Sequence, residues 1–275
     1  MPIHTREIVA LGGISVEWGS AIDHYLSTLA AGARAPGTVR LHRHYLRMFA
    51  RIAGPVSDVR EGDILEWLST PGWAPETRKS ARCVIVAFYR WAARTGQCGA
   101  NPAANLPSIR IPAAEARPAP QAVFDYAIAN ATDDQRTMLR LARYAALRCC
   151  EIAAIHRDDL DGDLLYVTGK GGKRRIVPIL DTHLIDAITA ADGYLFPGQI
   201  NGHVSAAWVS RQLGRLLEGD WTAHKLRHAF ASAAYAHNPD IYALAKFMGH
   251  ARVETTQRYT QMRTENLRRV AEAAA

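Results

Sequence analysis

The stretch TAHKLRHAFAS, residues 222–232, places two cationic side chains at the start of a predicted helix. Thr222 can cap the N-terminus of that helix with its hydroxyl group. His224 and Arg227 follow, and their spacing puts both on one helix face. The free N–H groups of a first helical turn bind anions well. The pattern predicts an anion-binding helix end, although a His-x-x-Arg spacing also occurs by chance.

An earlier stretch, ALRCCEIAAI (146–155), carries an arginine that needs a partner. Arg148 follows an apolar helical run, so we expect it to be partly buried and to contact an acidic group. Glu151 comes one helical turn later and could be that group. A structural ion pair and a clamp on a phosphate group fit these residues equally well.

The stretch VTGKGGKRRIVPI (167–179) indicates a β-hairpin with a glycine-rich turn. The phosphate-loop pattern GxxxxGK[ST] is not met, because Lys173 is followed by Arg174, and GxGxxG also fails. No nucleotide cofactor is therefore expected. Solvated lysines are one explanation of such a turn. The alternative is that Lys170, at the hairpin tip, reaches a DNA groove and donates a proton.

Near the C-terminus, GHARVETTQRYTQ (249–261) sets a tyrosine among polar residues. Gly249 can end the preceding helix, His250 follows it, and Tyr259 comes later in the stretch. A helical tyrosine is usually a core residue with a polar tip, but these neighbours give Tyr259 little to pack against. The histidines form neither HExxH nor a Cys/His cluster, so no metal site is predicted.

The composition is that of a globular protein with a basic balance. The chain has 275 residues, of which 48% are hydrophobic, so two domains or one large domain are expected. A net charge of +7 and a pI of about 9.4 favour a polyanionic partner, nucleic acid before membrane, although solubility also explains the charge. No apolar run approaches the about 18 residues of a membrane span. The four cysteines form no CxxC pair, which indicates a reducing cytosol.

Helical periodicity dominates the first third of the chain. The segments 17–30, 63–69 and 75–96 have helical patterns, and Thr38 can cap a further helix that runs to about residue 53. Two basic groups on these helices are candidates to contact DNA phosphates, with a solvated basic face as the alternative. They are Arg40, Arg43, Arg47 and Arg51 at helical spacing, and Arg78, Lys79 and Arg82 near a helix N-terminus.

Prolines mark the predicted domain boundary. Residues 101–120 contain five prolines and little periodicity, so we expect a linker at 106–118 between domains at 15–105 and 119–275. The second domain is predicted to be mostly helical with a small antiparallel sheet, which makes the fold mainly α (α+β). Its strands are expected at 164–168 and 175–180, and its helices at 121–130, 133–148, 181–191, 204–217, 222–236, 240–248, 252–260 and 264–275.

Taken together, the ordered stretches ALRCCEIAAI, VTGKGGKRRIVPI, TAHKLRHAFAS and FMGHARVETTQRYT resemble those of the tyrosine recombinase (phage integrase) family, with XerC/XerD-like site-specific recombinases among its members. The resemblance covers residues 119–262. The segment from TVRLHRHYLRMF through GANPA resembles the family's helical, SAM-like core-binding domain, and the resemblance implies a C-shaped clamp of two domains around DNA. The sequence departs from the family in Ala146, where glycine is usual, and in Cys149-Cys150, where small or polar residues are more usual.

The resemblance also implies a role for each residue of the site. Tyr259 would attack the scissile phosphate and form a 3′-phosphotyrosyl bond, freeing a 5′-hydroxyl group. Lys170 would protonate the leaving 5′-oxygen, and His224 would assist proton transfer at the tyrosine. Arg148 and Arg227 would clamp the non-bridging phosphate oxygens.

Two further residues have supporting roles in this interpretation. His250 would hydrogen-bond the phosphate, and Glu151 would orient its neighbours from behind the site. Cationic side chains then supply what a metal ion supplies elsewhere. The reaction would need no metal, no ATP and no other cofactor.

The implied partner is a specific double-stranded DNA site, with Lys173 and Arg174 as further contacts. Four copies would exchange strands through a Holliday junction, and the helix at 264–275 would dock on a neighbouring copy or, alternatively, on its own domain. We expect no membrane partner, and we expect a short integrase of a phage or mobile element in the bacterial cytoplasm, associated with the nucleoid. Chromosome-dimer resolution and transposon movement stay open. A type IB topoisomerase and a DNA-binding protein without chemistry are rivals, and the complete residue set favours the recombinase.

Overall fold

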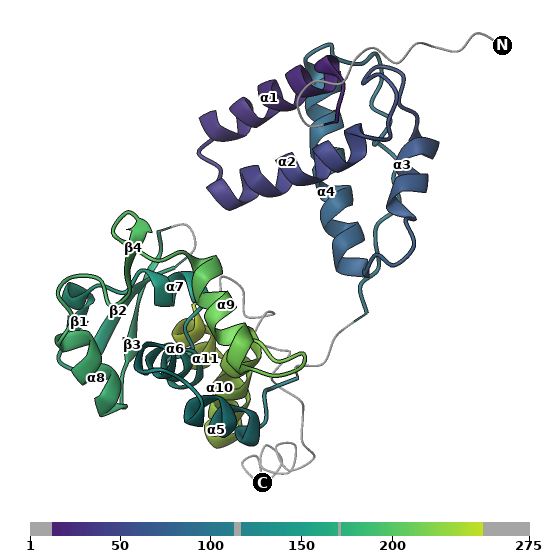
Figure 1. Ribbon diagram of the computed structural model, residues 1–275. Helices are drawn as coiled ribbons and strands as arrows, with labels where there is room; N and C mark the ends of the chain where they lie inside the picture. The colour runs from purple at the N-terminus through teal and green to yellow at the C-terminus, as the bar shows by residue number, and fades with distance from the viewer. Residues whose placement is uncertain (1–12, 113–116, 170–171, 250–275) are drawn as a thin grey trace, which may run out of the picture. The chain divides into compact units, whose positions relative to one another are not determined.

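The computed structural model describes residues 13–112, 117–169 and 172–249. The chain divides into two compact units, Met1–Ala113 and Ala114–Ala275, and Figure 1 shows the elements of each. The division falls inside the segment 106–118. Each unit contains its own cluster of buried hydrophobic side chains.

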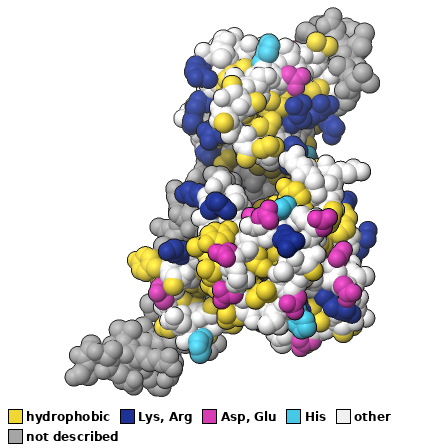
Figure 2. Space-filling view, turned by 90° about the vertical axis from the view of Figure 1, so that its left-hand side faces the viewer, with side chains coloured by type: hydrophobic (Ala, Val, Ile, Leu, Met, Phe, Trp, Pro, Cys, Tyr) yellow, Lys and Arg dark blue, Asp and Glu magenta, His cyan; other side chains and the backbone are white. Residues whose placement is uncertain are grey.

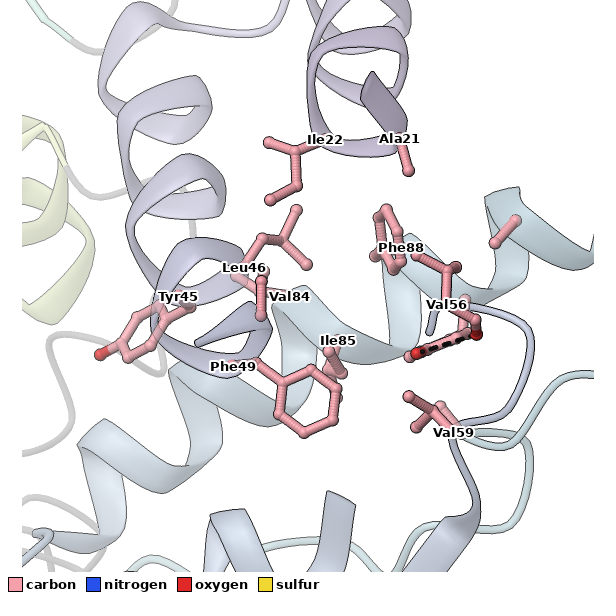
Figure 3. Close-up of a cluster of buried hydrophobic side chains, with 14 of the residues drawn as sticks. Ala21, Ile22, Tyr45, Leu46, Phe49, Val56, Val59, Val84, Ile85 and Phe88 are labelled. Carbon is pink, nitrogen blue, oxygen red and sulfur yellow. Dashed lines mark hydrogen bonds between the residues drawn. The ribbon is translucent and has the colours of Figure 1, made fainter. Parts of the chain in front are cut away.

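The N-terminal unit packs its helices around aromatic rings. Trp18 stacks on Phe88 with ring centroids 5.4 Å apart and meets Phe49 edge-on at 5.8 Å. Figure 3 shows Phe49 and Phe88 among aliphatic side chains in this core. Burial of such large apolar side chains is the main contribution to the stability of a small helical unit. The helices are α1 (Val16–Ala31), α2 (Pro36–Ala50), α3 (Glu61–Leu68) and α4 (Pro75–Arg94).

Helix α2 begins two residues earlier than the cap predicted at Thr38. Pro36 occupies the first turn, and the fixed φ angle of proline suits that position. Thr38 therefore lies inside the helix and does not cap it. The residue before the helix, Ala35, makes no side-chain capping bond.

In the C-terminal unit, helix α6 lies at the centre and packs against most of the other helices. Met138, Leu139 and Leu141 on it are fully buried. Thr132 caps it, with Gln135 completing a capping box. The helices of this unit are α5 (Gln121–Ala129), α6 (Asp133–Tyr144), α7 (Cys149–Ala153), α8 (Thr182–Thr189), α9 (Ala206–Leu216), α10 (Ala223–His237) and α11 (Ile241–Met248).

A three-stranded antiparallel sheet, in the order β1-β2-β3, forms one edge of this unit (Figure 1). Strand β2 (Leu164–Thr168) agrees with the prediction, whereas β3 (Arg174–Pro178) begins one residue earlier and ends two residues earlier than predicted. Beyond Pro178, the Ile179 N–H donates to the Asp163 carbonyl at 2.7 Å, which continues the register of β2 and β3 by one more residue pair. Strands β1 (Leu160–Asp161) and β4 (Pro197–Ile200) were not predicted, because runs this short show no periodic pattern.

The helix predicted at 133–148 breaks at Tyr144. Ala146 has a φ of 50°, a left-handed conformation that costs about 1–2 kcal/mol for a residue with a side chain. The chain then restarts as α7, with Arg148 at its N-cap. The sequence there consists of good helix formers, so nothing in it marked the break. Glycine adopts a positive φ without this cost, which gives a physical reason for the glycine that the resembled family usually has at the position of Ala146.

The predicted fold class is confirmed: the structure is mostly helical with a small antiparallel sheet. Among the helices that the structure describes, none combines the length and the apolar character that crossing a membrane requires.

Candidate active site

Three arginines surround one buried carboxylate in the C-terminal unit. The Glu151 side chain is fully buried. Arg148 Nη1 lies 2.7 Å from Glu151 Oε1, and Arg175 Nη1 and Nη2 donate to Oε1 and Oε2 at 2.8 and 2.9 Å. Arg227 Nη1 is 3.9 Å from Oε2. We call Arg148, Arg175 and Arg227 the arginine cluster.

Local backbone structure fixes Glu151 in place. It is the third residue of α7, and its Oε2 accepts the Arg148 backbone N–H at 2.8 Å. A carboxylate at this position satisfies a free N–H group of the helix N-terminus and is favoured by the helix dipole. Of the two alternatives for Arg148, the structure shows the ion pair with Glu151. The Arg148 side chain keeps 31% of its surface exposed, so it is also accessible to a ligand.

The pKa of Glu151 reflects two opposing effects. Burial alone would raise it, because a charged group is disfavoured away from water. The hydrogen bonds from Arg175 and from the Arg148 backbone, with the charges of both guanidinium groups, outweigh burial and hold the pKa of Glu151 below its usual value. The carboxylate is therefore ionised at neutral pH. Three guanidinium charges against one carboxylate leave the cluster with a net positive charge.

Arg227 reaches the cluster from helix α10. Thr222 caps this helix as predicted, with its Oγ1 accepting the Lys225 N–H at 3.4 Å. The Arg227 side chain is 1% exposed and donates to the carbonyl oxygens of Ala146 and Met248. The left-handed turn at Ala146 thus supplies one of its acceptors.

His224 lies on the same helix but at the surface. Its ring is 4.3 Å, centroid to centroid, from the ring of His228, which is buried. His224 and Arg227 therefore share the N-terminal part of α10, as the sequence predicts, with the histidine exposed and the arginine enclosed.

Lys170, His250 and Tyr259 lie outside the described residues. The residues before the first two, Gly169 and Gly249, do contact the site. A Cβ atom on Gly169 would lie 3.5 Å from Glu151 Oε1. The Gly249 carbonyl accepts Arg148 Nη2 at 3.1 Å, and Gly249 ends α11 in a left-handed conformation with φ 61°, as expected of a helix-ending glycine.

Arg175 is a site residue that the sequence did not single out. A signal was present, because residues alternate between the two faces of a strand. Arg175 is in phase with Val177 and Ile179, which are both buried, so the pattern places a cation on the inner face. Its neighbours Lys173 and Arg174 are exposed, and Arg174 lies over the Tyr166 ring at 5.7 Å.

The basic residues of the N-terminal unit are mostly at its surface. Figure 2 shows groups of Lys and Arg side chains on this unit. Arg40, Arg43 and Arg51 of the predicted helical stripe are exposed and Arg47 is half-buried. Arg43 lies 3.3 Å from Asp23, both largely exposed. We call Arg40, Arg43, Arg47 and Arg51 the α2 stripe.

The second basic group, on α4, is partly used within the unit. Arg82 Nη2 donates to the Leu106 carbonyl at 2.7 Å, and Arg78 Nη2 to the Thr70 carbonyl at 3.4 Å. Lys79 is exposed. These bonds give Arg78 and Arg82 a structural role that the sequence did not predict.

Comparison with known proteins identifies the family of this chain. Residues 122–266 match the phage integrase family. The tyrosine recombinase XerC of Xanthomonas axonopodis pv. citri is 32% identical over 212 residues, which are 68% of this chain and 68% of that protein.

Two solved structures of lambda integrase share the fold. One is a dimer bound to a COC' core site, with a TM-score of 0.74, 18% identity and coverage of 90% of this chain and 78% of that chain. The other is a tetramer bound to a Holliday junction, with a TM-score of 0.71, 18% identity and coverage of 86% and 78%. With the family match and the XerC relative, this chain belongs to the phage integrase family, the tyrosine recombinases.

Proposed function

We propose that this tyrosine recombinase cleaves and rejoins duplex DNA at a specific site through a covalent bond to Tyr259. The observation that carries the proposal is the convergence of Arg148 and Arg227, from two separate helices, on the Glu151 carboxylate. Guanidinium groups suit a phosphodiester because each offers paired donors to two oxygens. In this proposal, the buried carboxylate orients the two arginines before DNA binds, and their donors then meet the charge that grows in the transition state.

In the proposed reaction, the Tyr259 oxygen attacks phosphorus and the bond from phosphorus to the 5′-oxygen breaks. The phenol proton passes towards His224, and the 5′-oxygen receives a proton from Lys170. Arg148, Arg227 and His250 hold the non-bridging oxygens. Attack by a 5′-hydroxyl group on the phosphotyrosine reverses the step, so the phosphodiester energy is kept and ATP is not used.

A covalent adduct tests the proposal. Duplexes that bind Tyr259→Phe are first selected from a randomised library, and the selected site is then nicked so that cleavage cannot reverse. The wild-type protein is expected to form a protein–DNA adduct, and Tyr259→Phe to bind equally well without forming one. The matched control is Tyr242→Phe, because Tyr242 is 74% exposed at the start of α11. If wild type forms no adduct on the selected site, the chain is a binding protein only.

We further propose that the N-terminal unit contacts the DNA through the α2 stripe, Lys79 and the exposed parts of Arg78 and Arg82. Supporting this, the stripe has three arginines on α2 and a fourth, Arg51, at its C-cap, with one acidic partner within 4 Å among the described residues. Lys173 and Arg174 would add contacts from the hairpin. With 106–118 as a linker, the domains at 15–105 and 119–275 would close around the duplex as a clamp.

We also propose a tetramer in which the segment 264–275 docks on a neighbouring copy. The receptor is an apolar cavity of about 560 Å³ in the C-terminal unit. It is bounded by α6, α8, α10, α11 and the end of β3, and Leu180 at its edge is 88% exposed. The apolar residues of that segment, such as Leu267 and Val270, suit this lining. The lambda integrase tetramer on a Holliday junction supports this assembly by analogy of fold.

Leu180→Glu tests the docking site. A charge at this edge should disfavour an apolar helix, so strand exchange between two duplexes should fall about tenfold or more, while adduct formation on a nicked duplex stays unchanged. Equal losses in both assays would indicate damage to the active site instead. Strand exchange by the wild type also separates a recombinase from a topoisomerase, which relaxes a single duplex.

The biological role has two candidates. Small size and basic charge suggested integration or excision of a phage or mobile element, whereas the XerC relatives favour chromosome-dimer resolution. In both cases the protein would act on DNA in the bacterial cytoplasm, in association with the nucleoid. The selected site distinguishes them, because a dimer-resolution site occurs once in the chromosome and an integration site flanks an inserted element.

A further inference from the structure

The last turn of helix α11 is held by all three members of the arginine cluster. A helix C-terminus leaves carbonyl groups without partners inside the helix. Here Arg175 Nε donates to the Phe247 carbonyl at 2.9 Å, Arg227 Nη2 to the Met248 carbonyl, and Arg148 Nη2 to the Gly249 carbonyl at 3.1 Å. Three consecutive carbonyls thus accept from three different arginines, and the positive charges also suit the negative end of the helix dipole.

The three arginines differ in how firmly they are held. The Arg175 side chain is 8% exposed, and its Nε, Nη1 and Nη2 each donate to protein oxygens. Arg148 is 31% exposed, and its bond to the Gly249 carbonyl lies at the surface. A phosphate oxygen is a stronger acceptor than a carbonyl, so Arg148 can exchange its Gly249 bond for DNA more readily than Arg175 can exchange its own bonds.

Packing ties Arg175 to the same turn. A Cβ atom on Gly249 would lie 3.0 Å from Arg175 Cδ and Nη1, so the glycine allows the turn to rest directly on the guanidinium group. Arg175 is also the second residue of β3, next to the turn of the hairpin. One side chain therefore joins the hairpin, the Glu151 carboxylate and the end of α11.

We propose that Arg175 is a positioning residue for the strand-transfer reaction. It holds Glu151 and the last turn of α11 in place while Arg148 releases the Gly249 carbonyl to bind the scissile phosphate. In the sequence, His250 directly follows this turn, and Lys170 lies in the hairpin turn that precedes β3. This inference rests on the proposed function.

The test compares Arg175→Gln and Arg175→Lys with wild type and with Arg136→Gln. Arg136 makes an ion pair with Asp133 at 2.7 Å on α6, outside the site, so it controls for loss of an arginine–carboxylate pair. Adduct formation is measured in single turnover on the nicked, selected duplex at saturating protein, together with the Kd for that duplex. Amide hydrogen exchange at Met248 and Gly249 is measured on the free protein.

Arg175→Gln should slow adduct formation about 100-fold, the order of loss that misplaced reacting groups produce, while the Kd changes less than about threefold. Arg175→Lys should recover only part of the rate, because a single nitrogen cannot reproduce the separate Nε and Nη donors that contact the Phe247 carbonyl and both Glu151 oxygens. The acidic limb of the rate–pH profile should also move to higher pH in Arg175→Gln, since among the described residues Glu151 then faces only the charges of Arg148 and Arg227. A merely structural role would lower the rate equally at every pH.

An unchanged rate at saturation, or a loss that appears only in Kd, would overturn the proposal. If wild type forms no adduct, the proposed function fails, and amide exchange still decides whether Arg175 holds the turn. Faster exchange at Met248 and Gly249 supports the anchor, and unchanged exchange refutes it. If Arg175→Gln does not fold, the same readouts in Arg175→Lys decide the question.

Discussion

The arginine cluster and the α2 stripe present the same side chain in two different environments. In the cluster, side-chain exposure is 31% for Arg148, 8% for Arg175 and 1% for Arg227, and all three face one buried carboxylate. In the stripe, Arg40 and Arg51 are exposed, and Arg43 pairs with Asp23 at the surface. The first arrangement fixes donors before a ligand arrives, whereas the second provides positive charge that attracts a polyanion without fixing it.

The largest expected difference between the arginine cluster and the α2 stripe is in how much the acidic partner of each contributes to the free energy of unfolding. Glu151→Gln removes the one carboxylate that the cluster faces within the described part of the chain, and it leaves guanidinium charges buried without compensation. The free energy of unfolding should therefore fall by about 3–5 kcal/mol. Urea denaturation measures this change. Asp23→Asn, which removes the partner of Arg43 in the stripe, should cost less than about 1 kcal/mol because that pair is exposed to solvent. Similar losses of unfolding free energy in Glu151→Gln and Asp23→Asn would contradict the distinction between a buried cluster and an exposed stripe.

The contribution of Glu151 to the free energy of unfolding should also depend on pH. The folded-state pKa of Glu151 is held below its usual value, so its contribution is present above the unfolded-state pKa and is lost as pH falls through the folded-state pKa. The stability difference between wild type and Glu151→Gln should therefore be largest near neutral pH and shrink below about pH 4.5. Denaturation at a series of pH values checks this, and a difference that grows on acidification would be inconsistent with it.

A smaller effect on the free energy of unfolding is expected at Ala146, whose carbonyl accepts from Arg227 of the cluster. Its φ of 50° is strained for alanine, so Ala146→Gly should raise the free energy of unfolding by about 1 kcal/mol. The carbonyl that Arg227 uses stays in place, and activity should be retained. Thermal unfolding measures the gain. A loss of stability would show that the backbone there is not strained.

The smallest effect on folding is expected in the stripe. Arg40→Gln should change the free energy of unfolding by less than about 0.5 kcal/mol. Its effect should appear in DNA binding, where the slope of log K against log salt falls by about one for each phosphate group that the protein no longer neutralises. Titration of a duplex at several salt concentrations tests this, and an unaltered slope would remove Arg40 from the residues proposed to bind DNA.

Sequence patterns predicted most of the described helices, with ends that differ by one or more residues, and strand β2 with its observed bounds. Amphipathic spacing and a cap such as Thr222 are local signals. The break after Tyr144 was missed, because local propensity does not signal the left-handed turn at Ala146, whose carbonyl accepts from the distant Arg227. The pairing of Arg148 with Glu151 was predictable from their spacing. Arg175 was not recognised, because its partners Glu151 and Phe247 are distant in sequence and are brought together only by the fold.

One measurement tests the central claim, that the cluster acts on the reacting phosphate and the stripe only on affinity. Arg148→Gln and Arg40→Gln are compared in single-turnover adduct formation on the nicked, selected duplex, with protein raised to saturation for each. Arg148→Gln should remain about 100-fold or more below wild type at saturation, since a fixed donor to the transition state is lost, whereas Arg40→Gln should recover the wild-type rate. A wild-type rate for Arg148→Gln, or a loss in Arg40→Gln that saturation does not restore, would contradict the account.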